Sequence, residues 1–483
     1  MSTDQPGAAA RVRAAAAERR TERRSRAFRR TVALTLVVLG VAAGAAGIVG
    51  AIQGPKLRSA AVDPVVATER ADQRVVLRFD QPVQDVEVTD IAIDPAVPLE
   101  VSTDQTSVTI RLGSVLDHGT EYVITADVVG SATGRSGTAE YRFVTPGAEM
   151  ATLVREADAD DRVELRTLDG GDPTVLMEAP RIQEFALLPA ATAAIVLGDD
   201  DSTTVALQAF GDPAAATIPL PDEGRAADLR SSGRTGIFGF TVTGQTIGDD
   251  GELELLSTLM IYDPVDGSGI PRTVEGLDGE PVQVQEWMFV PDTSSLVAQT
   301  FDAGLLLIDT TGLTAPVPLG EFTDLRGFLP GTTTLVVADP TAVSAIDLAS
   351  GETRTLDLPE VEVPEGTYET GFVIAGEESY VEIVSRAVSE ENPFDLRFAA
   401  IVVDEQGTGL LYDATESAAV IREICVSPNG QYAAVAVSDD GAEFDAYPDE
   451  AAYFGMTSII VSIADGEIAG SARGTHSDWC VVD

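Results

Sequence analysis

The chain has 483 residues and a formal net charge of -47, and 44% of its residues are hydrophobic. That hydrophobic share excludes a wholly disordered chain, and the length allows two or three domains. The charge is uneven: residues 1–30 contain nine Arg against three acidic residues and carry +6, which leaves -53 on the remainder. This strongly acidic remainder of the chain repels phosphate backbones, which disfavours nucleic acid as a partner. A single Lys and abundant Ala, Val, Asp and Arg fit a high-GC, actinobacterial-type composition.

The first element in chain order is an uncharged apolar stretch at residues 31–54. Its 24 residues are enough for a helix that crosses the ~30 Å hydrocarbon core of a bilayer. The Arg-rich residues 1–30 lie directly before it, and only Lys56 and Arg58 follow closely. The positive-inside rule therefore predicts a disordered cytoplasmic tail, one transmembrane helix and an extracytoplasmic bulk. We expect a single-pass protein of the cell membrane.

A cleaved export signal is the alternative interpretation of the same stretch. Small residues at 43–47 could form a cleavage site, and Arg29-Arg30 loosely resembles a twin-arginine signal. The apolar run is longer than the usual 7–15-residue core of a signal peptide, which favours an uncleaved anchor. The sequence leaves the alternative open.

Residues 60–146 alternate between short strands and turn-forming residues. The predicted strands are Arg74–Phe79, Val86–Ile93, Ser107–Leu112, Glu121–Val129 and Ala139–Val144. A segment of this size with short strands and no helical period predicts an immunoglobulin-like (Ig-like) β-sandwich.

The same segment resembles the bacterial Ig-like domains of surface and S-layer proteins. The matching stretches are VLRFDQPV at 76–83, LDHGTEY at 116–122 and YRFVT at 141–145. The resemblance implies a spacer or adhesion module. His118 lies in a predicted turn, so we interpret it as a solvent-facing residue and not as a ligand.

The remainder of the chain, residues 149–483, contains a repeat that starts with a polar residue followed by an apolar run. Seven starts lie 40 to 58 residues apart, at Glu184, Asp228, Glu286, Arg326, Thr370, Glu423 and Asp478. Three further strand candidates follow each complete start, and four strands per repeat are typical of a propeller blade. The sequence therefore predicts an all-β chain in which the Ig-like sandwich precedes a seven-bladed β-propeller.

One repeat carries a motif specific enough to suggest a family. Ser427-Pro428-Asn429-Gly430 resembles the motif of TolB-like bacterial propellers. The other copies are degenerate. The resemblance implies a propeller fold and no particular ligand.

The last repeat start is the C-terminus itself, and no strands follow it. The strands directly after the Ig-like segment lack a first strand, so we expect the C-terminus to supply the innermost strand of that blade. Closing the ring in this way removes exposed sheet edges. Cys425 and Cys480 hold the same repeat position in neighbouring blades, which makes them a candidate disulfide outside the cytoplasm. Two buried free thiols remain the alternative.

No catalytic motif is present, and the chain has only two His. There is no nucleophile elbow, zinc-protease helix, phosphate-binding glycine loop or paired-cysteine motif. The acidic clusters, including Asp158–Asp161 and Asp199–Asp201, do not match the spacing of a calcium loop, so we interpret them as solvated turns. We therefore predict no catalytic residue, cofactor or metal site.

Three predicted blades carry long connections between their second and third strands, at residues 244–254, 387–396 and 439–455. Such connections emerge on one face of a propeller. The third mixes acidic and aromatic residues, a composition that suits a partner surface. The candidate partner-binding residues are Phe444, Asp445, Tyr447, Asp449, Tyr453 and Phe454. The alternative is a loop that packs its aromatic residues onto its own blade.

These observations favour a non-enzymatic, extracytoplasmic binding or scaffold protein that presents a propeller face to a protein or envelope ligand. One alternative is an envelope hydrolase or lyase acting on carbohydrate through propeller carboxylates, because the distance between carboxylates in space is invisible in a sequence. The other is a purely structural surface protein.

Overall fold

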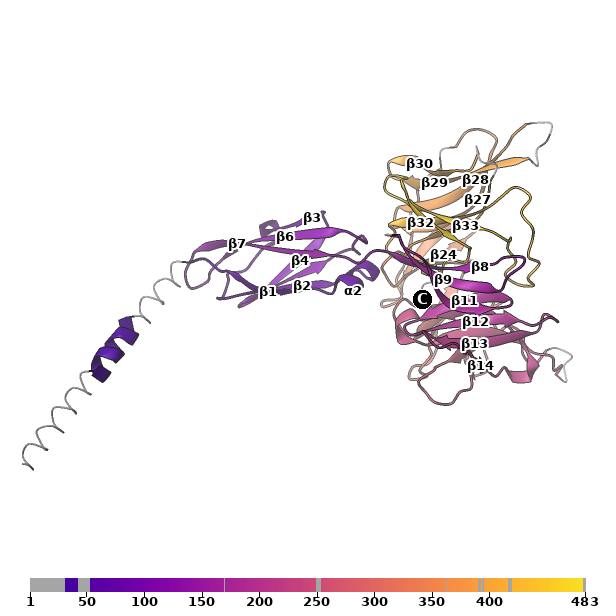
Figure 1. The fold of residues 1–483 in the computed structure, drawn as a ribbon, viewed down its shortest axis with the longest axis horizontal. Helices are drawn as coiled ribbons and strands as arrows, with labels where there is room; N and C mark the ends of the chain where they lie inside the picture. Colours follow the sequence, from indigo (N-terminus) through magenta and orange to yellow (C-terminus); the bar gives the residue numbers. More distant parts are fainter. Residues whose placement is uncertain are drawn as a thin grey trace, which may run out of the picture. The chain divides into compact units, whose positions relative to one another are not determined.

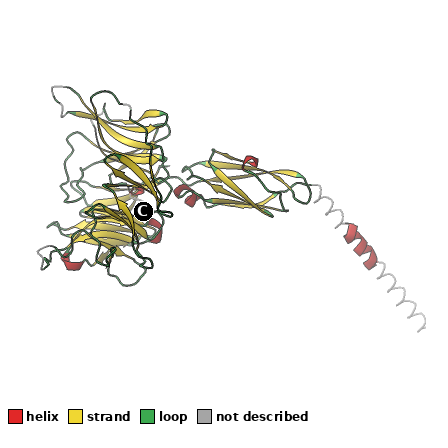
Figure 2. Ribbon diagram, turned by 180° about the vertical axis from the view of Figure 1, so that it is seen from behind, coloured by secondary structure: helices red, strands yellow, loops and turns green. Residues whose placement is uncertain are grey.

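The computed structural model describes residues 31–41, 53–168, 170–248, 253–361, 363–389, 392, 395–415 and 419–480. Strands are the main secondary structure of the described residues (Figure 2). The chain divides into two compact units. The first unit contains the chain up to Val62 together with residues 74–111 and 123–142; the second contains residues 63–73, 112–122 and 143–483.

Residues 31–41 form a helix on which every side chain is exposed, drawn in indigo in Figure 1. In the part of the chain that the structure describes, no helix is long and apolar enough to cross a membrane. Residues 42–52 of the predicted spanning segment, and the basic tail at 1–30, lie outside the described residues. The transmembrane helix therefore stays a prediction.

Two antiparallel sheets follow this helix. The first has the order β1-β2-β5-β4 and the second the order β3-β6-β7. Their strands are β1 (Leu57–Ala61), β2 (Arg74–Phe79), β3 (Ile91–Asp94), β4 (Leu99–Asp104), β5 (Ser107–Leu112), β6 (Glu121–Val129) and β7 (Ser136–Val144). Strands β2, β5 and β6 begin and end at the residues that the sequence predicts, whereas the predicted strand at 86–93 is divided between the 3₁₀ turn η1 (Val88–Asp90) and β3.

Each of these sheets has one buried apolar face. In β2, Val75, Leu77 and Phe79 are buried while the residues between them are not, and β6 alternates in the same way at Ile124 and Ala126. An antiparallel sheet with one apolar face is stable only when that face is covered. The alternation explains why two sheets form here, and the aromatic rings of Tyr122 and Phe143 stack with their centroids 5.6 Å apart.

Helix α2 (Pro64–Glu69) belongs to the second unit. It starts where the sequence supplies both a cap and a rigid first residue. The Asp63 carboxylate accepts hydrogen bonds from the backbone N–H groups of Val65 and Val66 at 3.2 and 3.3 Å, and Pro64 occupies the first helical position.

The rest of the second unit consists of consecutive antiparallel sheets whose strands follow chain order. A three-stranded sheet contains β8 (Glu149–Val154), β9 (Asp161–Thr167) and β10 (Thr174–Ala179). Six four-stranded sheets follow. The first three contain β11 (Ile182–Leu188), β12 (Ala191–Leu197), β13 (Thr203–Ala209), β14 (Ala216–Ile218); β15 (Arg225–Ser231), β16 (Phe238–Thr243), β17 (Thr258–Tyr262), β18 (Arg272–Thr273); and β19 (Glu286–Phe289), β20 (Ser295–Gln299), β21 (Gly304–Asp309), β22 (Val317–Glu321).

The last three sheets repeat the pattern. They contain β23 (Asp324–Phe328), β24 (Thr334–Asp339), β25 (Ala342–Asp347), β26 (Thr353–Thr355); β27 (Thr367–Gly376), β28 (Ser379–Ala387), β29 (Leu396–Asp404), β30 (Gly407–Asp413); and β31 (Val420–Val426), β32 (Tyr432–Ser438), β33 (Thr457–Ser462), β34 (Ile468–Arg473). The remaining 3₁₀ turns are η2 (Pro221–Glu223), η3 (Gly233–Thr235) and η4 (Asp478–Cys480).

Buried apolar clusters join each of these sheets to the next one. The pairs run in order from β8–β10 to β31–β34, and each cluster draws residues from both members of its pair. A further cluster returns from β31–β34 to β8–β10, where Met150 packs with Ala434 and Ile460. Four-stranded sheets that pack face to face and return to the first one form a β-propeller (Figure 1).

The first strands of the sheets are the innermost elements of this ring. Contacts run from β11 to β15, β19, β23, β27 and β31 in turn, then to η4, and from η4 back to β11. All seven repeat starts identified in the sequence lie on these elements, from Glu184 on β11 to Asp478 on η4. The sequence repeat therefore marks the inner position of each sheet.

As far as residue 480, the C-terminal segment lies at the predicted place but does not form the predicted strand. Thr475 and Leu153 of β8 exchange two backbone hydrogen bonds of 2.8 and 3.0 Å, which places the segment beside the inner edge of β8. The ladder stops there, because Gly474 and His476 have φ values of 98° and 51° that turn the chain out of the extended conformation. The described residues then continue as the 3₁₀ turn η4.

The closing interface also contains a cysteine. Cys425 packs in the cluster between β31–β34 and β8–β10 and is disulfide-bonded. The chain contains one other cysteine, Cys480, whose side chain lies outside the described residues. The Cys425–Cys480 pairing therefore stays a prediction.

Trp479 provides a test of the closure. Its buried ring stacks on Tyr432 with centroids 6.0 Å apart and joins the closing cluster. We expect Trp479→Ala to lower the free energy of unfolding by about 3–5 kcal/mol, because it leaves a cavity in this interface. Urea unfolding measures the change. The control Ile468→Ala, on an exposed side chain of β34, is expected to stay within about 0.5 kcal/mol. Equal stability of the two variants would show that the ring does not depend on this segment.

Candidate functional site

The loop that joins β32 to β33 crosses from its own sheet to three others. We call residues 439–456 the crossing loop. Its Asp445 forms an ion pair with Arg155, directly after β8. Its Asp449 accepts hydrogen bonds from Gln183 of β11 and from Arg225 of β15. The loop therefore lies across the inner ends of successive sheets and is tied to each of them.

Arg155 is the centre of these ties. Its Nη1 donates to Asp445 Oδ2 at 2.6 Å and to the Glu450 carbonyl at 2.7 Å. Its Nε and Nη2 donate to the carbonyls of Ile182 and Gln183 at 3.1 and 2.6 Å. The side chains of Arg155 and Asp445 are 1% and 0% exposed. A buried charge is tolerated only when it is paired and hydrogen-bonded, and here both conditions are met.

Tyr447 fixes the middle of the crossing loop. Its hydroxyl donates to Asp161 Oδ2 at 2.7 Å, and the guanidinium of Arg155 lies 4.2 Å from the centre of its ring. Asp161 also accepts the backbone N–H of Ile182 at 2.8 Å. Burial raises the pKa of Asp161, and burial together with the Asp161 hydrogen bond raises the pKa of Tyr447. Asp161 is buried, so its assignment to a solvated acidic turn is wrong.

The structure separates the six predicted partner-binding residues into two groups. Asp445 and Tyr447 are buried and hold the crossing loop in place, and the partly exposed Asp449 pairs with Arg225. Tyr453 and Phe454 are partly buried. The Tyr453 ring lies 3.9 Å from the Arg422 guanidinium and makes an edge contact with the exposed Phe444 at 5.6 Å.

Beside the crossing loop, carboxylates from the innermost strands influence one another. Glu184 on β11 accepts the backbone N–H groups of Asp228 and Leu229 at 3.2 and 2.6 Å. Burial, together with the neighbouring Glu450 and Asp228, raises its pKa to about 8. Burial likewise raises the pKa of Glu286 on β19, and desolvation with a contribution from Glu423 raises the pKa of Glu450, which belongs to the crossing loop.

A carboxyl group whose pKa lies near neutrality can donate or accept a proton at working pH, so Glu184 has the property of a general acid or base. The described residues contain no group of three or more His, Cys, Asp or Glu side chains that could hold a metal ion. The site therefore offers proton transfer, but the crossing loop bonds directly to the elements that carry it.

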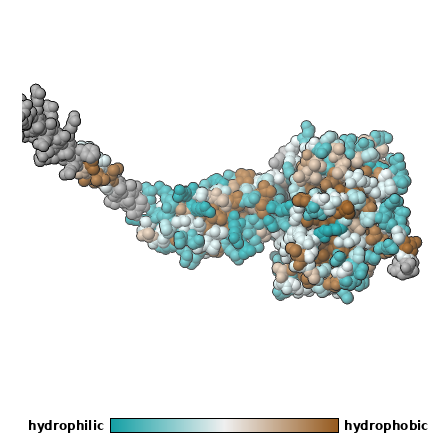
Figure 3. Space-filling view, turned by 90° about the horizontal axis from the view of Figure 1, so that it is seen from below, coloured by the Kyte–Doolittle hydropathy of each residue, from teal (hydrophilic) through white to brown (hydrophobic). Residues whose placement is uncertain are grey.

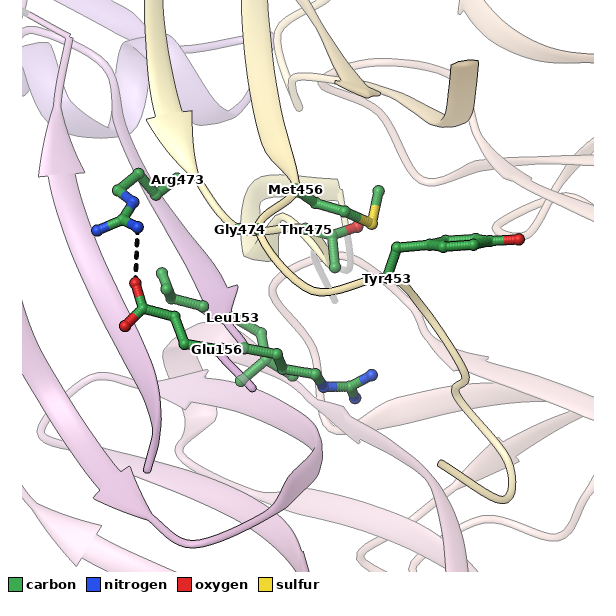
Figure 4. A pocket seen from close by; sticks show the side chains of 10 residues that line it. Leu153, Glu156, Tyr453, Met456, Arg473, Gly474 and Thr475 are labelled. Carbon is green, nitrogen blue, oxygen red and sulfur yellow. Dashed lines mark ion pairs between the residues drawn. The ribbon is translucent and has the colours of Figure 1, made fainter. Parts of the chain in front are cut away.

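The space left between the crossing loop and the strands β8 and β34 is small. A cavity of about 10 Å³ lies between β8 and β34, lined by Leu153, Met456 and Thr475 among others (Figure 4). At its rim Arg473 and Glu156 form an ion pair of 2.6 Å, marked by the dashed line in Figure 4. Such a volume holds at most a single water molecule. This part of the ring is filled by side chains.

Several residues of this arrangement carry no signal in the sequence. Arg155 ends an ordinary apolar strand, and its partner Asp445 is 290 residues away. Gln183 and Arg225 are equally inconspicuous. Only the repeat points to Glu184 and Glu286, because both stand at a repeat start. A search for charged residues next to repeat starts could have found the carboxylates, but not Arg155.

No family model and no curated protein matches the chain. Solved structures with a similar arrangement include an auxiliary nutrient binding protein from Bacteroides thetaiotaomicron, at 9% identity and a TM-score of 0.30 over 75% of this chain and 86% of that one. The β-propeller domain of the Trilobed protease from Pyrococcus furiosus is similar at 9% identity and a TM-score of 0.33, over 69% of this chain and 98% of that one. A putative TolB from Agrobacterium tumefaciens is similar at 12% identity and a TM-score of 0.30, over 68% of this chain and 91% of that one. These scores are too low to support a functional conclusion.

The buried ion pair predicts a large effect for Arg155. We expect Arg155→Met to lower the free energy of unfolding by about 3–5 kcal/mol, because it leaves Asp445 buried without a partner. Arg225→Met is the matched control, since its pair with Asp449 is partly exposed and contributes at most about 1 kcal/mol. Urea denaturation measures both. If Arg155→Met costs no more than Arg225→Met, the crossing loop is not held by this pair.

Glu184 predicts a dependence of stability on pH. Its pKa is raised in the folded protein from 4.5 to about 8, so the folded state holds a proton that the unfolded state releases. The corresponding stability is complete below pH 4.5 and is lost as pH rises to about 8. Glu184→Gln should make the loss of stability with rising pH smaller. Part of the loss should remain, because the pKa values of Glu286 and Glu450 are also raised. Urea unfolding midpoints measured at about pH 5, 6.5 and 8 test the expectation. If the midpoint of Glu184→Gln falls with pH as steeply as that of the parent, the expectation is wrong.

Proposed function

We propose that the chain is a membrane-anchored, extracytoplasmic binding or scaffold protein without enzymatic activity. In this proposal a seven-bladed propeller presents its outer turns to a protein or envelope partner, and an Ig-like sandwich acts as a spacer. The partner is a protein or an envelope component and not nucleic acid, because the chain carries -47 at pH 7.

The observation that carries the proposal is the crossing loop. It places buried or paired side chains, including Asp445 and Asp449, over the inner strands where a propeller enzyme would need an open pocket. The inner carboxylate Glu184 lies next to Gln183, which bonds to the loop, and near Glu450 of the loop, whose charge contributes to the raised pKa of Glu184. Recognition by the outer surface leaves the loop in its place, whereas turnover of a substrate at these inner strands would require the loop to move.

The architecture of the proposal has its own support. The closed sequence of apolar clusters from β8–β10 around to β31–β34 favours seven blades. The helix at residues 31–41 exposes apolar side chains around its whole circumference, including Leu34, Leu36 and Val41. A helix that is apolar on all sides needs an apolar environment, which favours the membrane anchor.

An envelope hydrolase or lyase acting on carbohydrate is the second candidate. The observation that favours it is the raised pKa of Glu184, which reaches about 8, beside that of Glu286. For this function the crossing loop has to move away from the inner strands, which requires the Arg155–Asp445 ion pair to break. A purely structural surface protein is the third reading, and it differs from a scaffold in having no specific partner.

A cross-linking experiment distinguishes these functions. The full-length chain, expressed in its own cells with a photo-reactive amino acid at exposed positions of the propeller such as Phe444, should give discrete adducts in the cell envelope. The double variant Glu184→Gln/Glu286→Gln should keep them, because a scaffold does not use these carboxyl groups. Loss of cellular function with adducts retained would indicate the hydrolase. If no exposed position gives an adduct, the result would favour the purely structural surface protein.

Fractionation tests the anchor. The intact chain should sediment with membranes and be released by detergent but not by salt or carbonate. Recovery from the medium of a form lacking residues 1–50 would instead establish a cleaved signal.

A further inference from the structure

Two neighbouring outer turns of the propeller display large apolar side chains to solvent. The turn at residues 263–271 joins β17 to β18 and exposes Val265 and Ile270; the turn at residues 310–316 joins β21 to β22 and exposes Leu313. Val265 and Leu313 are each 86% exposed, and Ile270 is 63% exposed. Apolar side chains so far from the core add nothing to its stability. Figure 3 shows such apolar areas among hydrophilic ones on the surface of this unit.

The two turns lie next to each other. Their sheets share one buried cluster, in which Ile261 packs with Leu306 and Ile308. The Arg272 guanidinium, at the end of the first turn, donates to the carbonyl of Thr310 at the start of the second. Both turns connect the third and fourth strands of an antiparallel sheet, so they emerge at the same end of their sheets. The exposed side chains therefore belong to one region of the surface.

Both turns are held rigid by their own aspartates. Asp263 Oδ1 accepts the N–H of Val265 at 2.8 Å, and Asp266 Oδ1 accepts the N–H of Ser268 at 2.7 Å. Asp309 Oδ1 accepts the N–H of Thr311 at 2.9 Å, next to Leu313. Side chains presented on a fixed backbone bind with a smaller loss of conformational entropy than those of a mobile loop.

The equivalent turns of the following sheets do not share this property. The turns at residues 348–352, 405–406 and 463–467, all within the described part, present Ala, Ser, Gly, Asp, Glu and Gln to solvent. Their large apolar residues, Leu348 and Ile463, pack against core clusters instead. The equivalent turn of the preceding sheet, between β13 and β14, exposes Phe210 (44%), so exposed apolar turns are a feature of β11–β22 and not of the repeat as such.

The charge around the two turns defines the partner that fits. Hydrogen bonds from Ser268 lower the pKa of Asp266. Burial alone would raise the pKa of Asp309, but hydrogen bonds from Thr311 and Thr314 outweigh burial and lower the pKa. Both groups stay negative at neutral pH. The one Arg between the turns, Arg272, is bonded to a backbone carbonyl. A second copy of this chain, at -47, would be repelled from such a surface.

We propose that the turns at 263–271 and 310–316 form a docking surface for a basic, amphipathic segment of a partner protein. Its apolar side chains would cover Val265, Ile270 and Leu313, and its Lys or Arg side chains would face Asp263, Asp266 and Asp309. The proposal rests on the binding function proposed above and specifies the partner class and the part of the propeller that meets it.

The test uses the full-length chain in nanodiscs of zwitterionic lipid and a synthetic peptide helix with one Leu face and one Lys face. We expect saturable binding that weakens in high salt and whose Kd rises at least about tenfold, or 1.4 kcal/mol, in the double variant Val265→Asp/Leu313→Asp. The matched control is Ile468→Asp, which alters a similarly exposed apolar side chain (64%) on β34 and should bind normally.

Four outcomes would overturn the proposal: unchanged binding in the double variant, equal binding of a Leu/Glu peptide, binding to empty nanodiscs only, and self-association of the chain that the double variant abolishes. The last two would assign the region to a lipid surface or to a second copy. If cross-linking captures a natural partner but the double variant still binds that partner, the scaffold function stands and this docking surface is wrong.

Discussion

The structure depends on one interface, the apolar contact that returns from β31–β34 to β8–β10. Each earlier pair of sheets adjoins its neighbour in sequence, but this pair is joined only if two ends of the propeller separated by about 300 residues meet. Met150, Ala434, Ile460 and Trp479 bury the apolar surface that would otherwise remain at both ends of the array. Among the described residues, two backbone hydrogen bonds between Leu153 and Thr475 and one from the Thr152 hydroxyl to the Arg473 carbonyl join β8 to the C-terminal part, so side-chain packing and not a long ladder closes the ring.

Arg155 connects this closure to the crossing loop. A guanidinium buried next to the closing sheet must be neutralised, and the carboxylate that does so belongs to the crossing loop. The same group donates to carbonyls of β11, so three sheets share one charge. The position of the crossing loop is therefore a consequence of ring closure, and the accessibility of Glu184 and its neighbours follows from it.

The parts of this arrangement that the sequence could predict are those that repeat locally. Seven polar starts followed by apolar runs located every innermost element, and strict alternation located β2, β5 and β6 to the residue. The pairing of Arg155 with Asp445 was out of reach, because one buried ion pair has no period and no local pattern. The conformation of the C-terminus was missed for a related reason: positive φ at His476 ends the extended chain, and nothing in the residue type demands it.

The crossing loop also changes which loops can bind a partner. Its acidic and aromatic composition suggested a binding surface, yet the side chains that gave it that composition, Asp445 and Tyr447, are used internally. Buried aromatic and acidic residues in a long loop look the same in sequence as exposed ones, and the apolar residues of turns do too: Leu348 and Ile463 pack against core clusters, whereas Val265 and Leu313 do not. Val265 and Leu313 are each 86% exposed, in turns whose aspartates accept hydrogen bonds from the turn backbone, so they are not used internally. In this propeller the turns at 263–271 and 310–316 are therefore better evidence for recognition than the crossing loop.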